Sequence, residues 1–514
     1  MSEQKFEMSD IKVSEQGSGG RPDSASLIEK QTRTRRLFST SQLFAFSLVY
    51  FVTWGGLGTN MYFALINGGP VAYLFNFIIV FAGVLGQAAC LAELSSIMPI
   101  AGAQYYWTYA YSPPKYRMFL TWIQGWATWL AFVAGLASVI NGTIVNLEAS
   151  VQINFPDYIA GGWHTTVIVM AMLAFCTILN CWFFELVPWI ELSAGILNVV
   201  FFLIFFVALW VMSPRNPGSF ILTRTTFSGW ENEFVSWNVG MLTQIWLFIS
   251  FECVIHMGEE TKNARRAVPQ AMFWSIVVNG VLGFLMIITY IICMPPVEDL
   301  VSSSNPFIYL LKTALGSDTV TTVLVTGITT IGVGCCLSSF SSTTRLTWAW
   351  ARDGGLPLYF GHVDGKHRVP MRAVLLTCAL VMLLALLNIG TSTYVAFGAI
   401  TSLSSLASYV SYALILSVSL YARLTVGLKT SEWSMGRLGT PINIFALVYT
   451  LYCIIWLPFP TTVPVTATSM NYCGPVFIAV MAGAVGSWFV WAKHNWAGPN
   501  QGVAEIVMRS TEAN

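Results

Sequence analysis

The feature that most constrains this chain is a run of residues, 37–92, that contains no aspartate, glutamate, lysine or arginine. A helix needs about 20 apolar residues to cross the hydrocarbon core of a bilayer, so this run is long enough for two crossings. Only 10% of the 514 residues are charged, whereas an ordinary soluble domain has roughly 25%. The sequence therefore predicts an all-α polytopic protein embedded in a lipid bilayer.

Apolar runs separated by polar breaks predict about twelve transmembrane helices. They lie near residues 41–66, 70–94, 118–146, 164–184, 187–212, 236–258, 270–294, 318–344, 372–391, 394–421, 440–460 and 473–492. The even number places both termini on one side of the membrane. None of the intervening loops is long enough to hold a second domain, so we expect the function to reside within the membrane.

The positions of the basic residues predict the orientation. With a cytoplasmic N-terminus, the outer loops contain only Arg215, Arg224 and Lys312, and the other 22 of the 25 basic residues lie on the inner side. This distribution follows the positive-inside rule, so both termini are predicted to be cytoplasmic. The net charge of +1 gives no basic surface that would suggest a nucleic-acid partner. We expect the plasma membrane as the location, with the vacuolar membrane as the alternative.

The two ends of the chain and its cysteines carry no sign of further chemistry. Residues 1–37 are polar and predict a disordered cytoplasmic tail, and residues 493–514 form a short C-terminal tail. The ten cysteines lie in apolar stretches without C-x-x-C spacing, and the five histidines are scattered. We therefore interpret the cysteines as small apolar residues and expect no metal site and no cofactor. The sequon at Asn141 lies within an apolar run and is expected to be unused.

The first span contains a glycine cluster at mid-depth. Gly55, Gly56 and Gly58 are followed by Thr59, and each glycine lowers helix stability by about 1 kcal/mol relative to alanine. The helix can therefore unwind here, which exposes backbone groups that must face protein, water or a ligand. Close packing of helices against the glycines is the alternative explanation.

The sixth span carries Ser250 and Glu252 at a similar depth. A carboxylate inside the bilayer costs about 2.5–3.5 kcal/mol on insertion scales, and such residues usually face a cavity or relay protons. A neutral glutamic acid bonded to a neighbouring carbonyl is the alternative. Disrupted helices at positions one and six are typical of inverted-repeat transporters, whose substrate site lies between them at the midplane. Glu259 and Glu260 follow and are equally explained as a solvated helix end.

Four sequence motifs, in order along the chain, resemble one transporter family. They are "INGGPV", "LAELSSIMPIAGAQYYWTYAYSPPKYRMFLTWIQGW", "HMGEETKNARRAVPQAM" and "SSTTRLTWAWARDGGLP". The chain resembles the fungal amino acid/choline transporter group of the amino acid-polyamine-organocation superfamily, which includes GABA and choline permeases. The similarity covers about residues 40–490.

This resemblance implies a LeuT-like fold with a 5+5 inverted repeat and two further helices. The transporter domain then spans residues 38–492, with repeat one at about 38–212, repeat two at about 236–421 and the extra helices at about 440–492. In that superfamily the unwound parts of spans 1 and 6 hold the substrate. The positions implied here are Gly55, Gly56, Leu57, Gly58, Thr59, Ile249, Ser250, Phe251 and Glu252. Glu252 is implied as a proton-linked gate.

Other implied features are less specific. Trp126 and Trp129 on span 3 are three residues apart and can form one wall of the pocket, although aromatic residues at this density also serve as bilayer contacts. Some proton-coupled relatives carry a lysine on span 5, but this chain has no basic residue between Cys181 and Met212, where only Glu191 and Asn198 are available. A proton is nevertheless the expected coupling ion.

The expected function is secondary active import of amino acids or related amines by alternating access. A choline, quaternary amine or polyamine permease and a secondary-metabolite transporter are the alternatives, because glycine backbone suits a carboxylate whereas Trp54, Phe251 and Glu252 suit a cation. A nutrient receptor without transport is a remote alternative. An enzyme is not expected, because Glu252 and His256 can meet on one helix face but have no nucleophile beside them.

Overall fold

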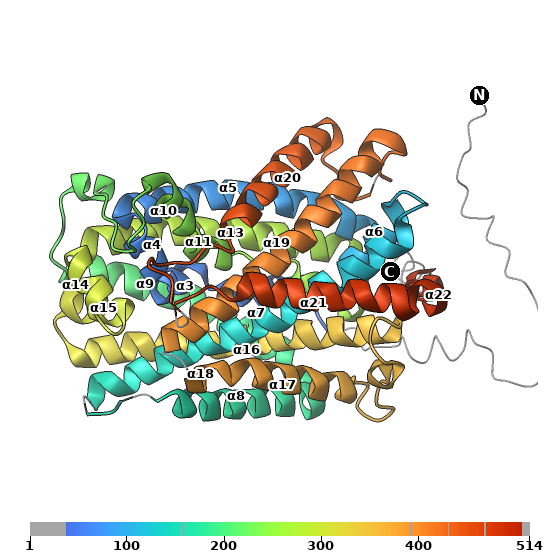
Figure 1. Cartoon of the computed structure of the whole chain (residues 1–514). Helices are drawn as coiled ribbons and strands as arrows, with labels where there is room; N and C mark the ends of the chain where they lie inside the picture. Colours follow the sequence, from blue (N-terminus) through green and yellow to red (C-terminus); the bar gives the residue numbers. More distant parts are fainter. Residues whose placement is uncertain are drawn as a thin grey trace, which may run out of the picture.

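The structure is a computed structural model that describes residues 37–155, 157–159, 161–390, 393–429, 431–466 and 469–505. Within these ranges the regular structure is helical, and the only β-type pairing is an isolated bridge between Phe38 and Thr261. Figure 1 shows an elongated bundle of long helices that run roughly along one axis. The predicted N-terminal tail lies outside the described residues except for Leu37.

Ten helical segments among the described residues are long and apolar enough to cross a membrane. They are α5 (Gly69–Ile97), α7 (Arg117–Asn154), α8 (Gly162–Trp182), η1 with α9 (Phe184–Leu186, Val187–Met212), α13 (Ala264–Cys293), α16 (Asp318–Arg352), α17 with α18 (Met371–Ala385, Leu387–Gly390), α19 (Thr393–Thr425), η5 with α20 (Gly436–Leu438, Gly439–Trp456), and α21 with η6 and α22 (Cys473–Ser487, Trp488–Ala492, Lys493–Asn495). The loops contain α6 (Gln104–Tyr111), α14 (Val297–Ser302), α15 (Pro306–Leu315), η2 (Gly218–Leu222) and η4 (Leu358–Gly361).

Two further segments are broken into short helices. The first contains α2 (Thr40–Phe51), α3 (Thr53–Thr59) and α4 (Met61–Ile66). The second contains α10 (Glu233–Val239), α11 (Leu242–Trp246), α12 (Cys253–His256) and η3 (Gly258–Glu260). These are the two spans that the sequence predicted to be interrupted. Because neither contains a helix of membrane-spanning length, the total of twelve spans and the 5+5 repeat stay predictions.

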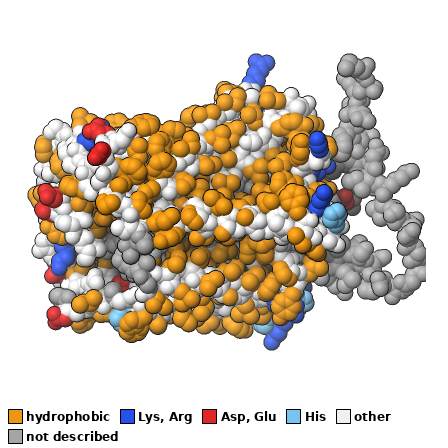
Figure 2. All heavy atoms as spheres, viewed as in Figure 1, with side chains coloured by type: hydrophobic (Ala, Val, Ile, Leu, Met, Phe, Trp, Pro, Cys, Tyr) orange, Lys and Arg blue, Asp and Glu red, His pale blue; other side chains and the backbone are white. Residues whose placement is uncertain are grey.

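The burial of each helix follows its composition. Helix α7 is rich in Gly, Ala, Ser and Thr and is largely buried between α16 and α19. Helices α9 and α21 are mostly exposed although their sequences are strongly apolar. Figure 2 shows this apolar surface along the sides of the bundle, with charged side chains gathered at its two ends. Such a surface would be unfavourable in water, so the chain is an integral multi-pass membrane protein.

Candidate functional site

A small cavity lies where the two broken segments meet α7 and α16. Its volume is about 70 Å³, well below the roughly 300–1,000 Å³ of pockets for drug-sized ligands. The broken segments contribute Tyr50, Phe51, Val52, Gly55, Gly56, Thr59, Trp246, Leu247, Ile249 and Ser250, and the surrounding helices contribute Gly135, Ser138, Val139, Gly142, Thr143, Asn146, Ile328, Gly332 and Cys335. None of these described lining residues is charged at neutral pH. The site therefore suits a small solute held by hydroxyl, amide and aromatic groups.

The first helix break lies at Val52 and not at the glycines. Val52 has a left-handed backbone with φ of 40°, whereas Gly55, Gly56 and Gly58 lie inside α3. The prediction that the glycines themselves are unwound is wrong. Side chains of distant helices determine where the break falls: Asn279 binds the carbonyl oxygen of Leu48 at 3.2 Å and the N–H of Thr53 at 3.3 Å. The freed backbone groups are thus satisfied by protein, as a low-dielectric environment requires.

The second break covers the segment from Leu247 to Glu252, as the sequence predicted. Ser250 has a φ of 56°, a left-handed conformation that is uncommon for residues other than glycine. Its N–H donates to the hydroxyl of Tyr412 on α19 at 2.8 Å. That hydroxyl in turn donates to Oε2 of Glu252 at 2.6 Å. Tyr412 therefore links the break directly to the buried carboxylate.

Glu252 lies beside the cavity but does not line it. Its side chain is 2% exposed, and Oε1 accepts a second hydrogen bond from Nε2 of Gln104 at 2.7 Å. The two hydrogen bonds favour the charged form of the carboxylate, whereas its burial favours the neutral form. His256, one turn further on, contacts the carbonyl oxygen of Ala101 through Nδ1 at 2.6 Å.

The structure brings only part of the predicted site residues to the cavity. Gly55, Gly56, Thr59, Ile249 and Ser250 line it. The remaining predicted positions on the broken spans point elsewhere. Leu57 is fully buried, Gly58 packs on Phe307 of α15, Phe251 stacks on Tyr412 with 5.0 Å between ring centres, and Glu252 is bonded as described. Contact of any of these residues with a substrate stays a prediction.

Trp126 and Trp129 lie away from the cavity. Nε1 of Trp129 donates to Thr347 on α16 at 3.0 Å. Trp126 lines a groove near α22, and the neighbouring Trp122 lies within 5.1 Å of Trp496 and 5.6 Å of Trp350, measured between ring centres. The two predicted wall residues therefore belong to the part of α7 that faces the C-terminal end of the chain.

A layer of side chains separates the cavity from a vestibule. Trp246 lines the cavity and donates to the hydroxyl of Ser138 at 2.9 Å, and its ring lies 5.4 Å from that of Phe397. Residues on both sides of Phe397, Val395 and Gly398, line a vestibule of about 540 Å³. The vestibule opens at the end of the bundle that contains α14 and α15 (Figure 1).

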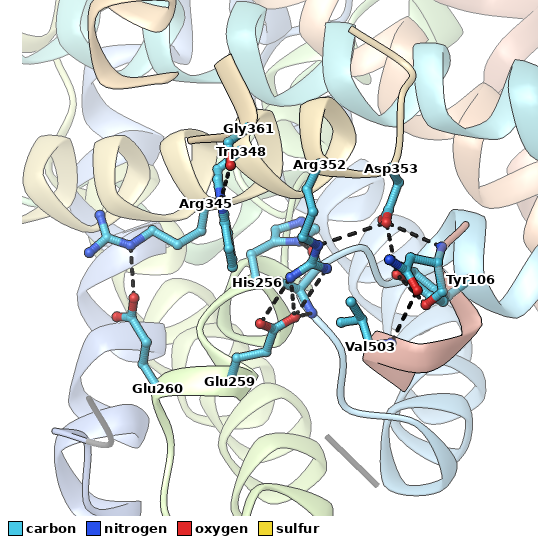
Figure 3. Close-up of polar contacts among 12 residues, drawn as sticks. Tyr106, His256, Glu259, Glu260, Arg345, Trp348, Arg352, Asp353, Gly361 and Val503 are labelled. Carbon is cyan, nitrogen blue, oxygen red and sulfur yellow. Dashed lines mark hydrogen bonds and ion pairs between the residues drawn. The ribbon is translucent and has the colours of Figure 1, made fainter. Parts of the chain in front are cut away.

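A much thicker layer closes the opposite end. Figure 3 shows two ion pairs between the end of the second broken segment and α16. Nη1 of Arg352 lies 3.2 Å from Oε2 of Glu259, and Nε of Arg345 lies 3.2 Å from Oε1 of Glu260. All four side chains are nearly inaccessible to solvent. We call this cluster the inner gate. The sequence was equally consistent with Glu259 and Glu260 as part of a solvated helix end. In the structure both are buried and paired with arginines.

The C-terminal segment, residues 496–505, covers the inner gate at Asp353. The indole N–H of Trp496 donates to the carbonyl oxygen of Asp353 at 2.7 Å, and the N–H of Asn500 donates to its Oδ1 at 3.2 Å. Tyr105 and Tyr106 donate to the same carboxylate at 2.6 Å and 3.1 Å. Burial raises the pKa of Asp353 above its usual value, while adjacent Arg352 and these hydrogen bonds work in the opposite direction. Burial likewise raises the pKa of Glu260, against the effect of Arg345.

Several residues of the site carried little signal in the sequence. Asn279, Gln104 and Tyr412 lie in three separate parts of the chain, and each of their three contacts with the broken spans joins residues more than 140 positions apart. A polar residue in a membrane span marks a functional or structural contact. Its partner, however, is determined only by the packing of the helices.

Comparison with known proteins places the chain in one family. A family model described as amino acid permease matches residues 38–482. A choline transporter of Saccharomyces cerevisiae is 26% identical over 465 residues, which cover 89% of this chain and 82% of that protein. The GABA-specific permease of the same yeast is 28% identical, covering 90% and 83%. Amino-acid permease 2 of Neurospora crassa is 27% identical, covering 90% and 86%. The broken helices, the cavity between them and the match over most of the chain lead to one conclusion: the chain belongs to the amino acid permease family of membrane transporters.

Proposed function

We propose that this protein is a secondary active transporter that imports amino acids or related amines by alternating access. The observation that carries the proposal is the asymmetry around the cavity. A layer of side chains that includes the Trp246–Phe397 ring pair separates it from the vestibule, whereas the inner gate, Asp353 and the C-terminal segment close the other end. A transporter closed on one side needs such an arrangement, and the reverse arrangement completes the cycle.

The lining of the cavity supports a small substrate with both apolar and polar parts. The hydroxyls of Ser138, Thr143 and Ser250 can serve as hydrogen-bond partners, and the buried Oγ of Ser250 has no partner among the described residues. A buried polar atom without a partner is costly, so a bound solute that engages it would gain affinity. An amino acid or GABA-like molecule meets this requirement. The amino acid and GABA permeases among the relatives are in keeping with this substrate class.

A quaternary amine such as choline is the second candidate. Tyr50, Phe51 and Trp246 present aromatic rings to the cavity, and aromatic rings bind quaternary ammonium groups through cation–π attraction. Glu252 lies one hydrogen bond beyond Ser250, through Tyr412, and would supply the compensating negative charge. The choline transporter among the relatives is in keeping with this alternative.

We further propose that transport is coupled to protons through Glu252 and that the Lys- and Arg-rich end of the bundle is cytoplasmic. The plasma membrane is the proposed location. Glu252 connects the break at Ser250 to Gln104, whose helix α6 carries the tyrosines that bind Asp353. A change of charge at Glu252 would therefore act on the cavity and on the inner gate together.

Uptake of a radiolabelled panel tests the substrate class. The panel contains GABA, neutral and basic amino acids, choline and polyamines. It is supplied to cells that lack their own permeases and express this chain. We expect saturable uptake of amino acids or GABA that increases at acidic external pH. Uptake of choline alone would select the second candidate. Absence of uptake for the whole panel, with the protein at the cell surface, would contradict the proposal.

A further inference from the structure

A second buried glutamate, Glu191, has surroundings opposite to those of Glu252. It lies near the start of α9, its exposed fraction is 0%, and neither of its carboxylate oxygens has a hydrogen-bond partner among the described residues. Glu252, by contrast, accepts hydrogen bonds on both oxygens. Neither carboxylate forms an ion pair with a described residue.

The position of Glu191 is defined by its neighbours one turn along α9. Ala194 packs on Gly334 of α16. A Cβ added at Gly334 would lie 3.0 Å from the Cβ of Ala194. Gly195 packs on Ala45 of α2. A Cβ added at Gly195 would lie 3.1 Å from the Cβ of Ala45. Glu191 therefore lies at the junction of α9 with the first broken segment and with the helix that carries both arginines of the inner gate.

The titratable groups around Glu191 are neutral. Cys176 of α8, Cys253 of α12, and Cys335 and Cys336 of α16 lie within its electrostatic range. Helix α2 contributes Tyr50, which interacts with Cys253 and Cys335. The hydrogen bonds between α13 and α9, such as the one from Trp210 to Thr289, lie near the far end of α9. The described surroundings thus contain no cation that would balance a charge on Glu191.

This environment disfavours an ionised carboxylate. A buried charge without hydrogen bonds or a counter-ion is strongly unfavourable, and such a group is neutralised instead. A metal cation would need several oxygen ligands around the carboxylate, and neither oxygen of Glu191 has a polar partner among the described residues. A proton needs no such ligand set. Protonation is therefore the neutralisation that these surroundings allow.

We propose that Glu191 is a second proton-binding site, which holds a proton while the inner gate is closed and releases it when the gate opens. On opening, α2 and α12 move relative to α9 and α16, and water reaches the carboxyl group from the inner side. The O–H bond then breaks, the proton passes to water, and the carboxylate remains on Glu191. The link to substrate is short, because Cys335 lines the cavity and Cys253 directly follows Glu252. This inference rests on the proposed proton-coupled transport.

Infrared spectroscopy of the purified protein tests the protonation itself. At neutral pH we expect a carbonyl band of a protonated carboxylic acid that shifts little in D₂O and loses intensity in Glu191→Gln. The control Glu298→Gln removes an exposed carboxyl group of α14 and should leave the band unchanged. Absence of the band in the wild-type protein would overturn the proposal, whether or not the variant folds.

Reconstituted vesicles test the role in coupling. Uptake of a substrate identified by the panel is measured in two kinds of vesicles. One kind carries a pH gradient, and the other contains an excess of the same substrate inside. We expect Glu191→Gln to lose accumulation driven by the pH gradient, about tenfold for each pH unit, while it retains exchange of substrate for substrate. Accumulation at the wild-type level would overturn the proposal. If a pH gradient does not drive accumulation by the wild-type protein, the proposed proton coupling is wrong. The infrared band then still shows whether Glu191 is protonated.

Discussion

At the scale of single residues, the hydrogen bonds around Glu252 explain why an acid is retained within an apolar span. Tyr412 and Gln104 donate to its two oxygens, and Tyr412 also holds the N–H of Ser250 at the break. The carboxylate thus acts on the shape of the cavity without lining it. A substrate cation or a proton at Glu252 would weaken the hydrogen bond between Glu252 and Tyr412. The backbone at the break could then change its conformation.

Glu252→Gln tests this role. The change preserves the size of the side chain but removes its charge. We expect loss of accumulation driven by a pH gradient, about tenfold per pH unit, with substrate exchange retained. The measurement is uptake into vesicles at several external pH values. A variant with the same accumulation and pH profile as the wild-type protein would show that Glu252 only packs as a neutral acid.

Glycines near the cavity differ in what a side chain would meet, which gives a matched pair of tests. A Cβ added at Gly135 would have only Oγ of Ser250 within 4 Å, at 3.6 Å, whereas one at Gly58 would lie 2.4 Å from the ring of Phe307. Gly135→Ala should therefore transport normally, and Gly135→Leu should fill the cavity. Overfilling a packed site costs about 1–3 kcal/mol, so substrate affinity should fall about ten- to hundredfold.

Gly58→Ala provides the contrast to these cavity variants. It should lower the thermal stability of the purified protein, because Phe307 must move, and any loss of uptake should follow from that instability. Concentration-dependent uptake and thermal unfolding of the three variants separate the two effects. Normal substrate affinity in Gly135→Leu would show that the substrate binds elsewhere.

At the scale of helices, the sequence predicted which segments are broken but misplaced one break. Helix propensity marks Gly55, Gly56 and Gly58 as weak points, yet they lie in a helical turn between Val52 and Asn60. The break at Val52 depends on Asn279 and Cys335, which bind carbonyl groups of α2 from two other helices. Those partners are more than 200 positions away, so no local pattern could reveal them. The break at Ser250 was predictable because a charged residue marks it.

The inner gate provides an element-scale prediction. Arg352→Gln removes one partner of a buried ion pair, a change that costs about 3–5 kcal/mol where both charges are enclosed. We expect the variant to open more often on the Lys- and Arg-rich side, so that a thiol reagent added there alkylates Cys335 in the cavity faster. The experiment uses a Cys378→Ser background, because Cys378 is the one native cysteine that is partly exposed.

Arg372→Gln is the matched control for the gate. Arg372 lies at the same end of the bundle, donates to the carbonyl oxygen of Tyr359 at an exposed position and packs over the ring of the same tyrosine. Its replacement should leave alkylation of Cys335 at the wild-type rate. Equal rates in both variants would mean that the Glu259–Arg352 pair does not hold the gate.

At the scale of the whole molecule, composition was sufficient to predict a polytopic helical protein, and ten helices of membrane-spanning length agree with it. Orientation is a separate matter. Figure 2 shows acidic side chains together with basic ones at one end of the bundle, and mainly basic side chains at the end nearest α22. The sequence did not predict that residues 496–505 pack against the inner gate, because a short polar tail carries no pattern for its docking site.

Labelling from the two sides of the membrane tests the orientation. An added Cβ at Gly218 or at Gly365 meets no atom within 4 Å, so a cysteine fits at either position. Gly218 follows α9, and Gly365 lies in the loop after α16. We expect an impermeant reagent outside intact cells to label Gly218→Cys and to label Gly365→Cys only after the membrane is opened. The opposite pattern would place both termini outside.

The tryptophans beside the inner gate have an optical consequence. Trp122, Trp350 and Trp496 lie with their ring centres 5.1–5.9 Å apart, so their electronic transitions couple and should produce a signed couplet in near-ultraviolet circular dichroism. Such coupling falls steeply with distance. Departure of Trp496 from Asp353 would remove two of these three couplings and so change the signal. The protein therefore carries its own chromophore for following movement at this end of the bundle, without any attached label.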